Sequence, residues 1–202
     1  MRPLHRHFLQ ALAAPLLSLA AIAPADAKLE RYEFDPAHTR IAFAVDHFGY
    51  SHVLGAFARP TGVLMFNPDD WSRSKVDVTV ELSTLELGDD KFEKRILKRD
   101  FLGAKKHPHA RFVSTRIEPT GGNTAKVHGE LTLRGVTRPL TLDARLNKLA
   151  RNRYALMKKV AGFSATATLN RADWGMAGND GVIGASVELR IEAEAVRSAT
   201  TE

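Results

Sequence analysis

Hydrophobic and polar residues alternate along much of the chain. Apolar side chains occupy every second position in six segments, at 41–45, 76–82, 127–133, 140–146, 163–169 and 187–193. Because successive side chains of a β-strand point to opposite faces, each segment predicts a strand with one apolar face and one solvated face. Two further strands are predicted around 54–66 and 110–117. The chain is therefore expected to be all-β.

Turn-forming residues separate the predicted strands. Glycine, asparagine, aspartate or proline cluster at 67–70, 121–123, 134–135 and 175–184. Strands joined by short turns form antiparallel sheets. About eight strands with one apolar face each can build either a sandwich or a closed barrel, and the alternation alone does not distinguish the two.

One segment departs from the alternation and predicts an amphipathic helix at 88–99. Phe92 and Ile96 are four residues apart, which places them on one face of a helix. Asp89 or Asp90 can cap its start, and the cations that follow Leu97 suit its end. We expect this helix to pack on the outside of the sheet.

The first 27 residues have the pattern of a cleaved secretory signal peptide. Basic residues precede an apolar run from Phe8 to Ala23, and Ala25 and Ala27 supply a small-residue cleavage site. The alternative is an uncleaved membrane anchor, but the run is short for a spanning helix. Residues 28–202 are expected to form one domain, exported to the periplasm.

Composition and charge exclude several classes of function. The chain has no cysteine, which excludes thiol catalysis and cysteine zinc sites. Its net charge is +6, but the cations are interspersed with acidic residues, and export argues against a nucleic-acid partner. Weak, transient contact with an anionic membrane surface stays open.

Two constellations could support chemistry. His38, His47 and His52 are close in sequence, but a metal or haem site needs convergent ligands with supporting hydrogen bonds, and ordinary loop histidines are the simpler interpretation. Ser51 adjoins His52, yet neighbours on a strand face opposite sides, and no nucleophile-elbow motif is present. We therefore expect no metal, no cofactor and no enzymatic activity.

Several distinctive sequence blocks follow one another between Tyr32 and Val196, at 34–43, 47–57, 100–102, 107–108, 111–114, 129–139, 162–163 and 170–176. In their order and spacing, these blocks resemble the YceI-like family of periplasmic polyisoprenoid-binding proteins. The chain departs from the family pattern at 94–97, where a histidine is missing, and at Leu102 and Gly103. These departures affect the expected ligand more than the expected fold.

The resemblance implies a lipocalin-like antiparallel barrel of about eight strands, with an apolar tunnel for an isoprenoid tail, and a homodimer. An eight-stranded barrel is just wide enough for side chains or one slim ligand. Small residues at inward positions would leave room for a ligand, namely Gly129, Ala144, Ala165 and Ala167.

Candidate ligand-binding residues follow from these two arguments. Those expected on the tunnel wall are Phe43, Val45, Phe57, Val80, Phe112, Leu131, Leu142, Phe163, Ala165 and Trp174, and those expected at its mouth are Asn170, Arg171 and Asp173. The aromatic residues could line a tunnel or fill a core. Arg171 and Asp173 could contact a polar head group, or form an ion pair that closes the barrel end and anchors the loop at 175–184.

The leading hypothesis is a periplasmic binding protein that sequesters or carries a polyisoprenoid or an isoprenoid quinone-type lipid. One alternative is a hydrolase or isomerase that acts on a lipid in the same cavity, and it predicts polar, titration-shifted groups inside the barrel. A second alternative is a haem-associated stress protein.

Overall fold

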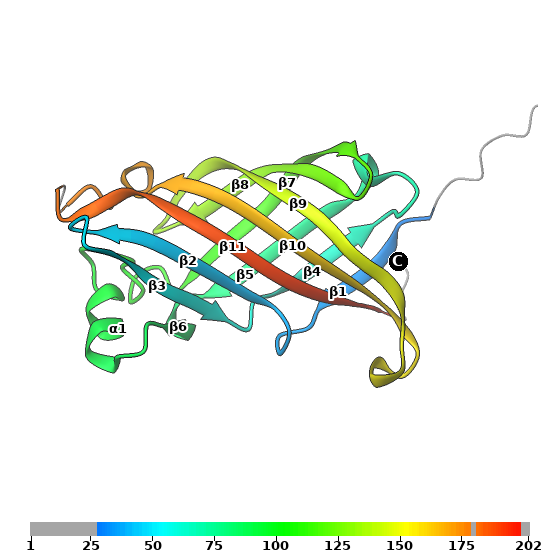
Figure 1. The fold of residues 1–202 in the computed structure, drawn as a ribbon, viewed down its shortest axis with the longest axis horizontal. Coiled ribbons are helices and arrows are strands. Elements are labelled where there is room, and N and C mark those ends of the chain that lie inside the picture. Colours follow the sequence, from blue (N-terminus) through cyan, green and yellow to red (C-terminus); the bar gives the residue numbers. More distant parts are fainter. Residues whose placement is uncertain (1–27, 179–180, 199–202) are drawn as a thin grey trace, which may run out of the picture.

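The computed structural model describes residues 28–178 and 181–198 (Figure 1). The predicted signal peptide at 1–27 lies outside the described residues and stays a prediction. Among the described residues, none of the helices has the length and hydropathy needed to cross a membrane.

Strands dominate the described part of the chain. They are β1 (Glu30–Phe34), β2 (Arg40–His47), β3 (Ser51–Ala58), β4 (Thr61–Phe66), β5 (Lys75–Glu81), β6 (Leu85–Glu86), β7 (His109–Gly121), β8 (Thr124–Leu133), β9 (Val136–Asn152), β10 (Lys158–Asn170) and β11 (Ile183–Arg197). Helix α1 (Asp90–Ile96) and the short 3-10 turns η1 (Trp71–Arg73), η2 (Leu82–Thr84), η3 (Arg153–Ala155) and η4 (Arg171–Trp174) complete the fold.

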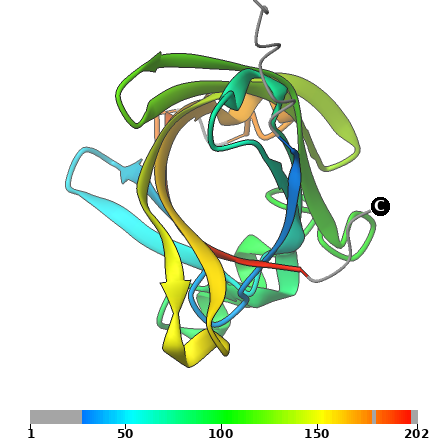
Figure 2. The same cartoon turned by 90° about the vertical axis from the view of Figure 1, so that its right-hand side faces the viewer.

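Eight of the strands form a closed antiparallel barrel, which confirms the predicted fold class. Their order around the barrel is β1-β4-β5-β7-β8-β9-β10-β11, and β11 returns to β1. The closing contact is short, with Tyr32 opposite Arg197 and Phe34 opposite Ala195. The view along the barrel shows the strands as a ring (Figure 2).

Strand β11 has two partners along one edge. Its last residues pair with β1, whereas its earlier residues pair with β2, with Ile191 opposite Ile41. Strand β2 continues to β3, and β3 pairs with β6. The strands β2, β3 and β6 thus extend the barrel wall at the end that carries α1 (Figure 1).

The single strand predicted around 54–66 is wrong, because two strands occupy this segment. The chain turns at Arg59, which has a φ of 54°, and at Pro60. Strand β3 pairs with β2 before this turn, and β4 joins the barrel beside β1 after it. Strand β1 was missed, since its inward face has only Tyr32 and Phe34, too few positions to establish a period.

Helix α1 is shorter than the predicted segment 88–99 but starts where expected. The side chain of Asp89 accepts a hydrogen bond from the backbone N–H of Phe92 at 2.8 Å and caps the helix. A carboxylate oxygen of Glu93 accepts a second bond from the N–H of Leu87 at 2.7 Å. These bonds hold α1 close to the β3–β6 edge (Figure 1).

Inward side chains pack more densely at the two ends of the barrel than between them. At the end opposite α1, the ring of Phe66 makes edge-to-face contacts with Tyr32, Trp71 and Phe163 at centroid distances of 5.6–6.2 Å. At the α1 end, Leu82, Trp174 and Met176 are buried in the larger of two hydrophobic clusters. The intervening space is the candidate site.

The surroundings of Gly129 in strand β8 leave no room for a side chain at this position. A β-carbon there would lie 2.4 Å from Cζ of Phe112 and 2.5 Å from the carbonyl oxygen of Val113, and the backbone cannot yield easily. We expect Gly129→Ala to lower the free energy of unfolding by about 1–3 kcal/mol in urea denaturation. Gly162→Ala in β10 is the matched control, because its nearest atom is 4.0 Å away. Equal losses in the two variants would contradict this account.

Candidate functional site: the barrel cavity

An apolar cavity of about 230 Å³ lies inside the barrel. Inward residues of the barrel strands line it, and so do Ile41 of β2, Phe57 of β3 and Leu102 from the segment after α1. The accessible surface of its wall consists of apolar atoms. Since engineered apolar cavities of about 150 Å³ already bind benzene, this cavity has room for a larger apolar group.

Three polar residues border the cavity, but each directs its polar atoms to a protein partner. The hydroxyl of Thr39 donates to the carbonyl of Glu194 at 3.3 Å. The hydroxyl of Ser74 accepts from the N–H of Asn67 at 3.0 Å. The guanidinium of Arg111 forms an exposed ion pair with Asp77, which lowers the pKa of that carboxyl through a hydrogen bond. The cavity therefore offers a ligand apolar contacts.

The structure brings most of the predicted wall residues together around this cavity. Seven of them line it: Phe57, Val80, Phe112, Leu131, Leu142, Phe163 and Ala165. They come from β3, β5, β7, β8, β9 and β10, so side chains far apart in sequence share one wall.

Phe43 and Val45 do not line the cavity. Both lie on the same side of β2 as Ile41, which does, but nearer the α1 end. The ring of Phe43 is 5.8 Å from that of Phe57 and lies against Gly55, where a β-carbon would come within 2.4 Å of it. Phe43 therefore fills the space that Gly55 leaves on the neighbouring strand.

The small residues predicted to leave room divide into two groups. Ala144 and Ala165 are paired directly across β9 and β10 and both line the cavity. Ala167 packs against the larger hydrophobic cluster without lining the cavity. At Gly129 the ring of Phe112 occupies the space. Of these four predicted small residues, the alanine pair therefore lines the cavity and leaves it space.

The polar block after β10 closes the α1 end and does not line the cavity. Arg171 is buried and donates hydrogen bonds to the carbonyls of Met176, Gly178, Ile183 and Gly184. This network anchors the described residues of the loop predicted at 175–184 through backbone carbonyls, and the expected ion pair of Arg171 with Asp173 stays a prediction.

The neighbours of Arg171 have separate roles in the same turn. The side chain of Asn170 accepts from the N–H of Ala172 at 3.0 Å and caps η4. Trp174 is buried, and its indole N–H donates to the carbonyl of Leu131 at 3.1 Å. Asp173 is exposed to solvent. None of the three lines the cavity.

The sequence arguments missed one section of the wall. Leu64, Phe66 and Trp71, from β4 and η1, line the cavity at the end opposite α1. Leu64 and Phe66 are separated by one residue, and this alternation was the available signal. The prediction of a single strand at 54–66 ignores this alternation, because it overlooks the turn at 59–60 that divides the segment.

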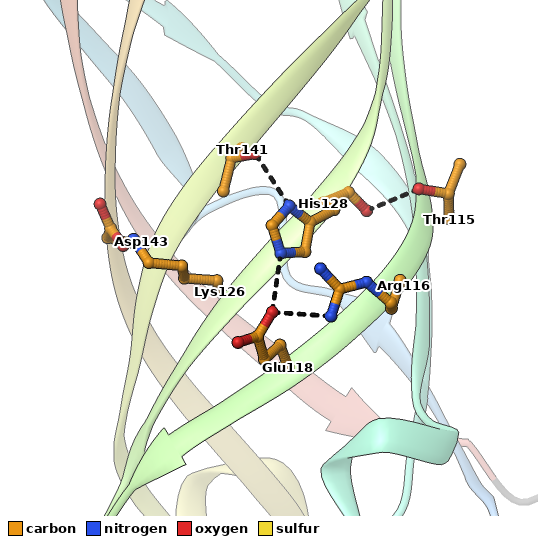
Figure 3. Close-up of polar contacts among 7 residues, drawn as sticks. All are labelled: Thr115, Arg116, Glu118, Lys126, His128, Thr141 and Asp143. Carbon is orange, nitrogen blue, oxygen red and sulfur yellow. Dashed lines mark hydrogen bonds and ion pairs between the residues drawn. The ribbon is translucent and has the colours of Figure 1, made fainter.

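The main polar cluster of β7, β8 and β9 lies on the outside of the barrel (Figure 3). His128 contacts the hydroxyl of Thr141 at 3.0 Å and a carboxylate oxygen of Glu118 at 3.3 Å. Arg116 also donates to Glu118, and these hydrogen bonds lower the pKa of Glu118. The cluster has no access to the cavity from this face, so it cannot act on a molecule held inside.

The predicted histidine group is spread over the length of β2. His38 precedes the strand, whereas His47 and His52 pair with Ser51 and Asp46 in the β2–β3 hairpin. Nδ1 of His38 is 2.7 Å from a carboxylate oxygen of Asp35, which raises the pKa of the imidazole. Asp35, His38 and Glu194 could together offer three ligand atoms at this exposed position.

A closed antiparallel barrel around an apolar cavity defines a binding protein for apolar ligands. The chain belongs to the YceI-like family: the sequence pattern of the YceI-like domain matches residues 32–195. This confirms the resemblance found in the sequence.

Relatives and solved structures agree with this assignment. The chain is 34% identical to UPF0312 proteins of Pseudomonas savastanoi pv. phaseolicola, covering 93% of this chain and 97% of that protein, and of Pseudomonas putida, covering 93% and 94%. The Campylobacter jejuni YceI protein superposes with a TM-score of 0.68 at 26% identity, over 76% and 90% of the two chains.

Two structures with lower sequence identity to this chain share the fold. Burkholderia cenocepacia BcnA superposes with a TM-score of 0.72 at 20% identity, over 80% of this chain and 98% of that one. A polyisoprenoid-binding domain of Saccharophagus degradans superposes with a TM-score of 0.63 at 13% identity, over 84% and 99%.

The role of Arg171 can be tested separately from ligand binding. Arg171→Met removes the donors to four carbonyls, some of them buried, and we expect it to lower the free energy of unfolding by about 2–4 kcal/mol. Hydrogen exchange should accelerate at 181–184 in particular. Arg190→Met is the control, since that exposed arginine forms its ion pair with the exposed carboxylate of Glu192. Unchanged exchange in the Arg171 variant would refute the anchoring role.

Proposed function

We propose that this protein is a periplasmic binding protein that sequesters or carries a long apolar ligand, a polyisoprenoid or an isoprenoid quinone-type lipid, in its barrel. The observation that carries the proposal is the continuous apolar wall of the cavity, to which ten strands and the segment after α1 contribute. The polyisoprenoid-binding description of the Saccharophagus degradans domain, which has the same fold, supports this class of ligand.

The shape of the cavity favours a slim, branched chain. Phe112 and Phe163 narrow the barrel, whereas the paired alanines Ala144 and Ala165 leave space between β9 and β10. Removing an apolar tail from water contributes about 0.8 kcal/mol per methylene, so the hydrophobic effect alone supplies substantial affinity. Shielding the tail from the aqueous periplasm requires no reacting group.

Binding is favoured over catalysis by the position of the polar groups. An enzyme that acts on the bound lipid would need acid, base or nucleophilic atoms that reach the cavity. The polar residues beside the cavity direct their hydrogen bonds elsewhere, and the cluster around His128 is external. Export through the leader at 1–27, which the sequence pattern predicts, and assembly as a homodimer, which the family resemblance implies, are parts of the same proposal.

Mass spectrometry of the bound lipid tests the proposal directly. The protein is purified from its native envelope and denatured, and the organic extract is analysed. We expect a prenyl lipid in stoichiometric amount. A folded protein that yields no lipid, and that also takes up no prenyl compound when titrated, would overturn the proposal.

Filling the space beside the paired alanines should displace the ligand. Ala144→Leu and Ala165→Leu place larger side chains on opposite strands at the same level of the cavity. We expect at least a tenfold loss of prenyl-lipid affinity in the double variant, measured by competition with a fluorescent prenyl probe. Thr166→Leu is the matched control, because this exposed neighbour lies on the outer face of β10. A milder variant, Ala165→Val, guards against misfolding. Full binding by both the double variant and Ala165→Val would exclude this cavity as the site.

A further inference from the structure

The hairpin between β9 and β10 exposes large apolar side chains at the barrel end opposite α1 (Figure 1). Tyr154, Leu156 and Met157 are 82%, 85% and 54% exposed. We call these three residues the β9–β10 tip. Both ribbon views place this hairpin on the rim of the barrel, projecting away from its axis (Figures 1 and 2).

The backbone holds the tip in a defined shape. The side chain of Asn152 accepts from the N–H of Tyr154 at 2.9 Å, and the carbonyl of Asn152 accepts from the N–H of Met157 at 2.9 Å. Leu156 and Met157 have φ of 52° and 60°, in the left-handed region that favours glycine or asparagine. The turn thus has Leu156 and Met157 at positions whose backbone conformation favours glycine or asparagine, and both side chains are exposed to solvent.

A band of positive charge surrounds the tip. No acidic residue occurs between Asp143 and Asp173, and the part of this segment up to Lys159 contains Arg145, Lys148, Arg151, Arg153, Lys158 and Lys159. Lys159 pairs with Glu30. The other five are exposed, and none of them forms an ion pair with any described residue.

The cations lie on both faces of the hairpin. Arg151 is directly opposite Lys159, and Lys148 and Lys158 occupy positions of the other strand face. Arg153 lies over the ring of Tyr154 at 4.7 Å. An apolar projection surrounded by cations on all sides matches an anionic lipid surface, where head-group phosphates lie directly above the acyl chains.

We propose that the β9–β10 hairpin docks the protein on an anionic membrane surface. The tip inserts Tyr154, Leu156 and Met157 at the boundary between head groups and acyl chains, and the surrounding lysines and arginines contact lipid phosphates. Long cationic side chains suit this depth, because their methylenes can lie among apolar groups while the charge stays at the phosphates.

The charge distribution favours a lipid surface over a second copy of the chain. Two copies meeting at this hairpin would bring cations against cations without acidic residues from the same segment to compensate. A stable protein interface also needs about 800 Å² from each partner, which a narrow hairpin tip does not provide.

The β2–β3 hairpin supplies an internal comparison at the opposite end of the barrel. Phe48, Tyr50 and Leu54 are 50%, 90% and 70% exposed there. No lysine or arginine occurs between Ile41 and Ala58, and the segment includes Asp46. This hairpin thus exposes apolar area without cations in its own segment, and we expect it to contribute little to binding an anionic surface.

Docking at the β9–β10 tip would direct one particular end of the cavity toward the membrane. Leu149 and Ala161 at the base of the hairpin belong to the hydrophobic cluster that contains Phe66 and Phe163, and both of these aromatic residues also line the cavity. The docking inference rests on the surface of the hairpin and does not require the proposed ligand.

Binding of the protein to lipid vesicles tests the docking. The protein is expressed in its native host, so that the leader is treated as it is in the cell. Phosphatidylcholine vesicles with and without phosphatidylglycerol are sedimented with the protein at low and high salt. We expect binding to the anionic vesicles, with loss in high salt. The double variant Leu156→Asn with Met157→Asn removes the two apolar side chains, and asparagine tolerates the left-handed backbone at both positions. We expect it to weaken vesicle binding by about tenfold or more. Lys148→Gln with Lys158→Gln should weaken it by about thirtyfold.

Phe48→Ser with Tyr50→Ser is the matched control and should bind like the unaltered protein. All variants share one N-terminus, so differences among them report on the hairpins. Equal binding to neutral vesicles, equal binding by the tip variants, or loss of binding in the Phe48 and Tyr50 control would each overturn the proposal. A change of oligomeric state in the tip variants without vesicle binding would instead identify a protein interface. Prenyl-probe uptake, measured in parallel, separates failure of docking from failure of the proposed lipid-binding function.

Discussion

Closure of the sheet between β1 and β11 is the constraint on which the rest of the structure depends. Three residue pairs form the ladder at this contact, from Tyr32 opposite Arg197 to Phe34 opposite Ala195. Without them β1 would lose its place beside β11, and the inward face of the sheet would be open to water. Glu30 reinforces the junction, since it pairs with Lys159 and Arg197 and accepts a hydrogen bond from Tyr32.

Closure alone does not produce a cavity, because side chains can fill an eight-stranded barrel completely. Here the aromatic cluster around Phe66 packs one end, and Trp174 and Met176 pack the other. Between these ends, the small residues Ala144 and Ala165 lie side by side on the neighbouring strands β9 and β10. The uneven distribution of side-chain volume along the barrel axis leaves the apolar space.

The loop that Arg171 anchors shows how polar groups are used in this fold. Its guanidinium satisfies four backbone carbonyls and is buried at the barrel end, away from the cavity wall. Polar side chains on the outer strand faces pair with one another, as around His128 and Glu118 (Figure 3). Inside and outside are thereby kept chemically distinct, which suits a container for an apolar molecule on an ordinary polar exterior.

Local pattern was sufficient for much of this outcome. Alternation in β5 and β8 to β11 identified strands and their inward faces, and Asp89 marked the start of α1, because side-chain direction and helix capping depend on near neighbours. The family blocks then identified the barrel class. Long-range pairing decided the rest: that 54–66 divides between two parts of the sheet, that Phe112 occupies the space at Gly129, and that Phe43 lies beyond the cavity. These results depend on which residues meet across strands, and a one-dimensional period carries no information about such contacts.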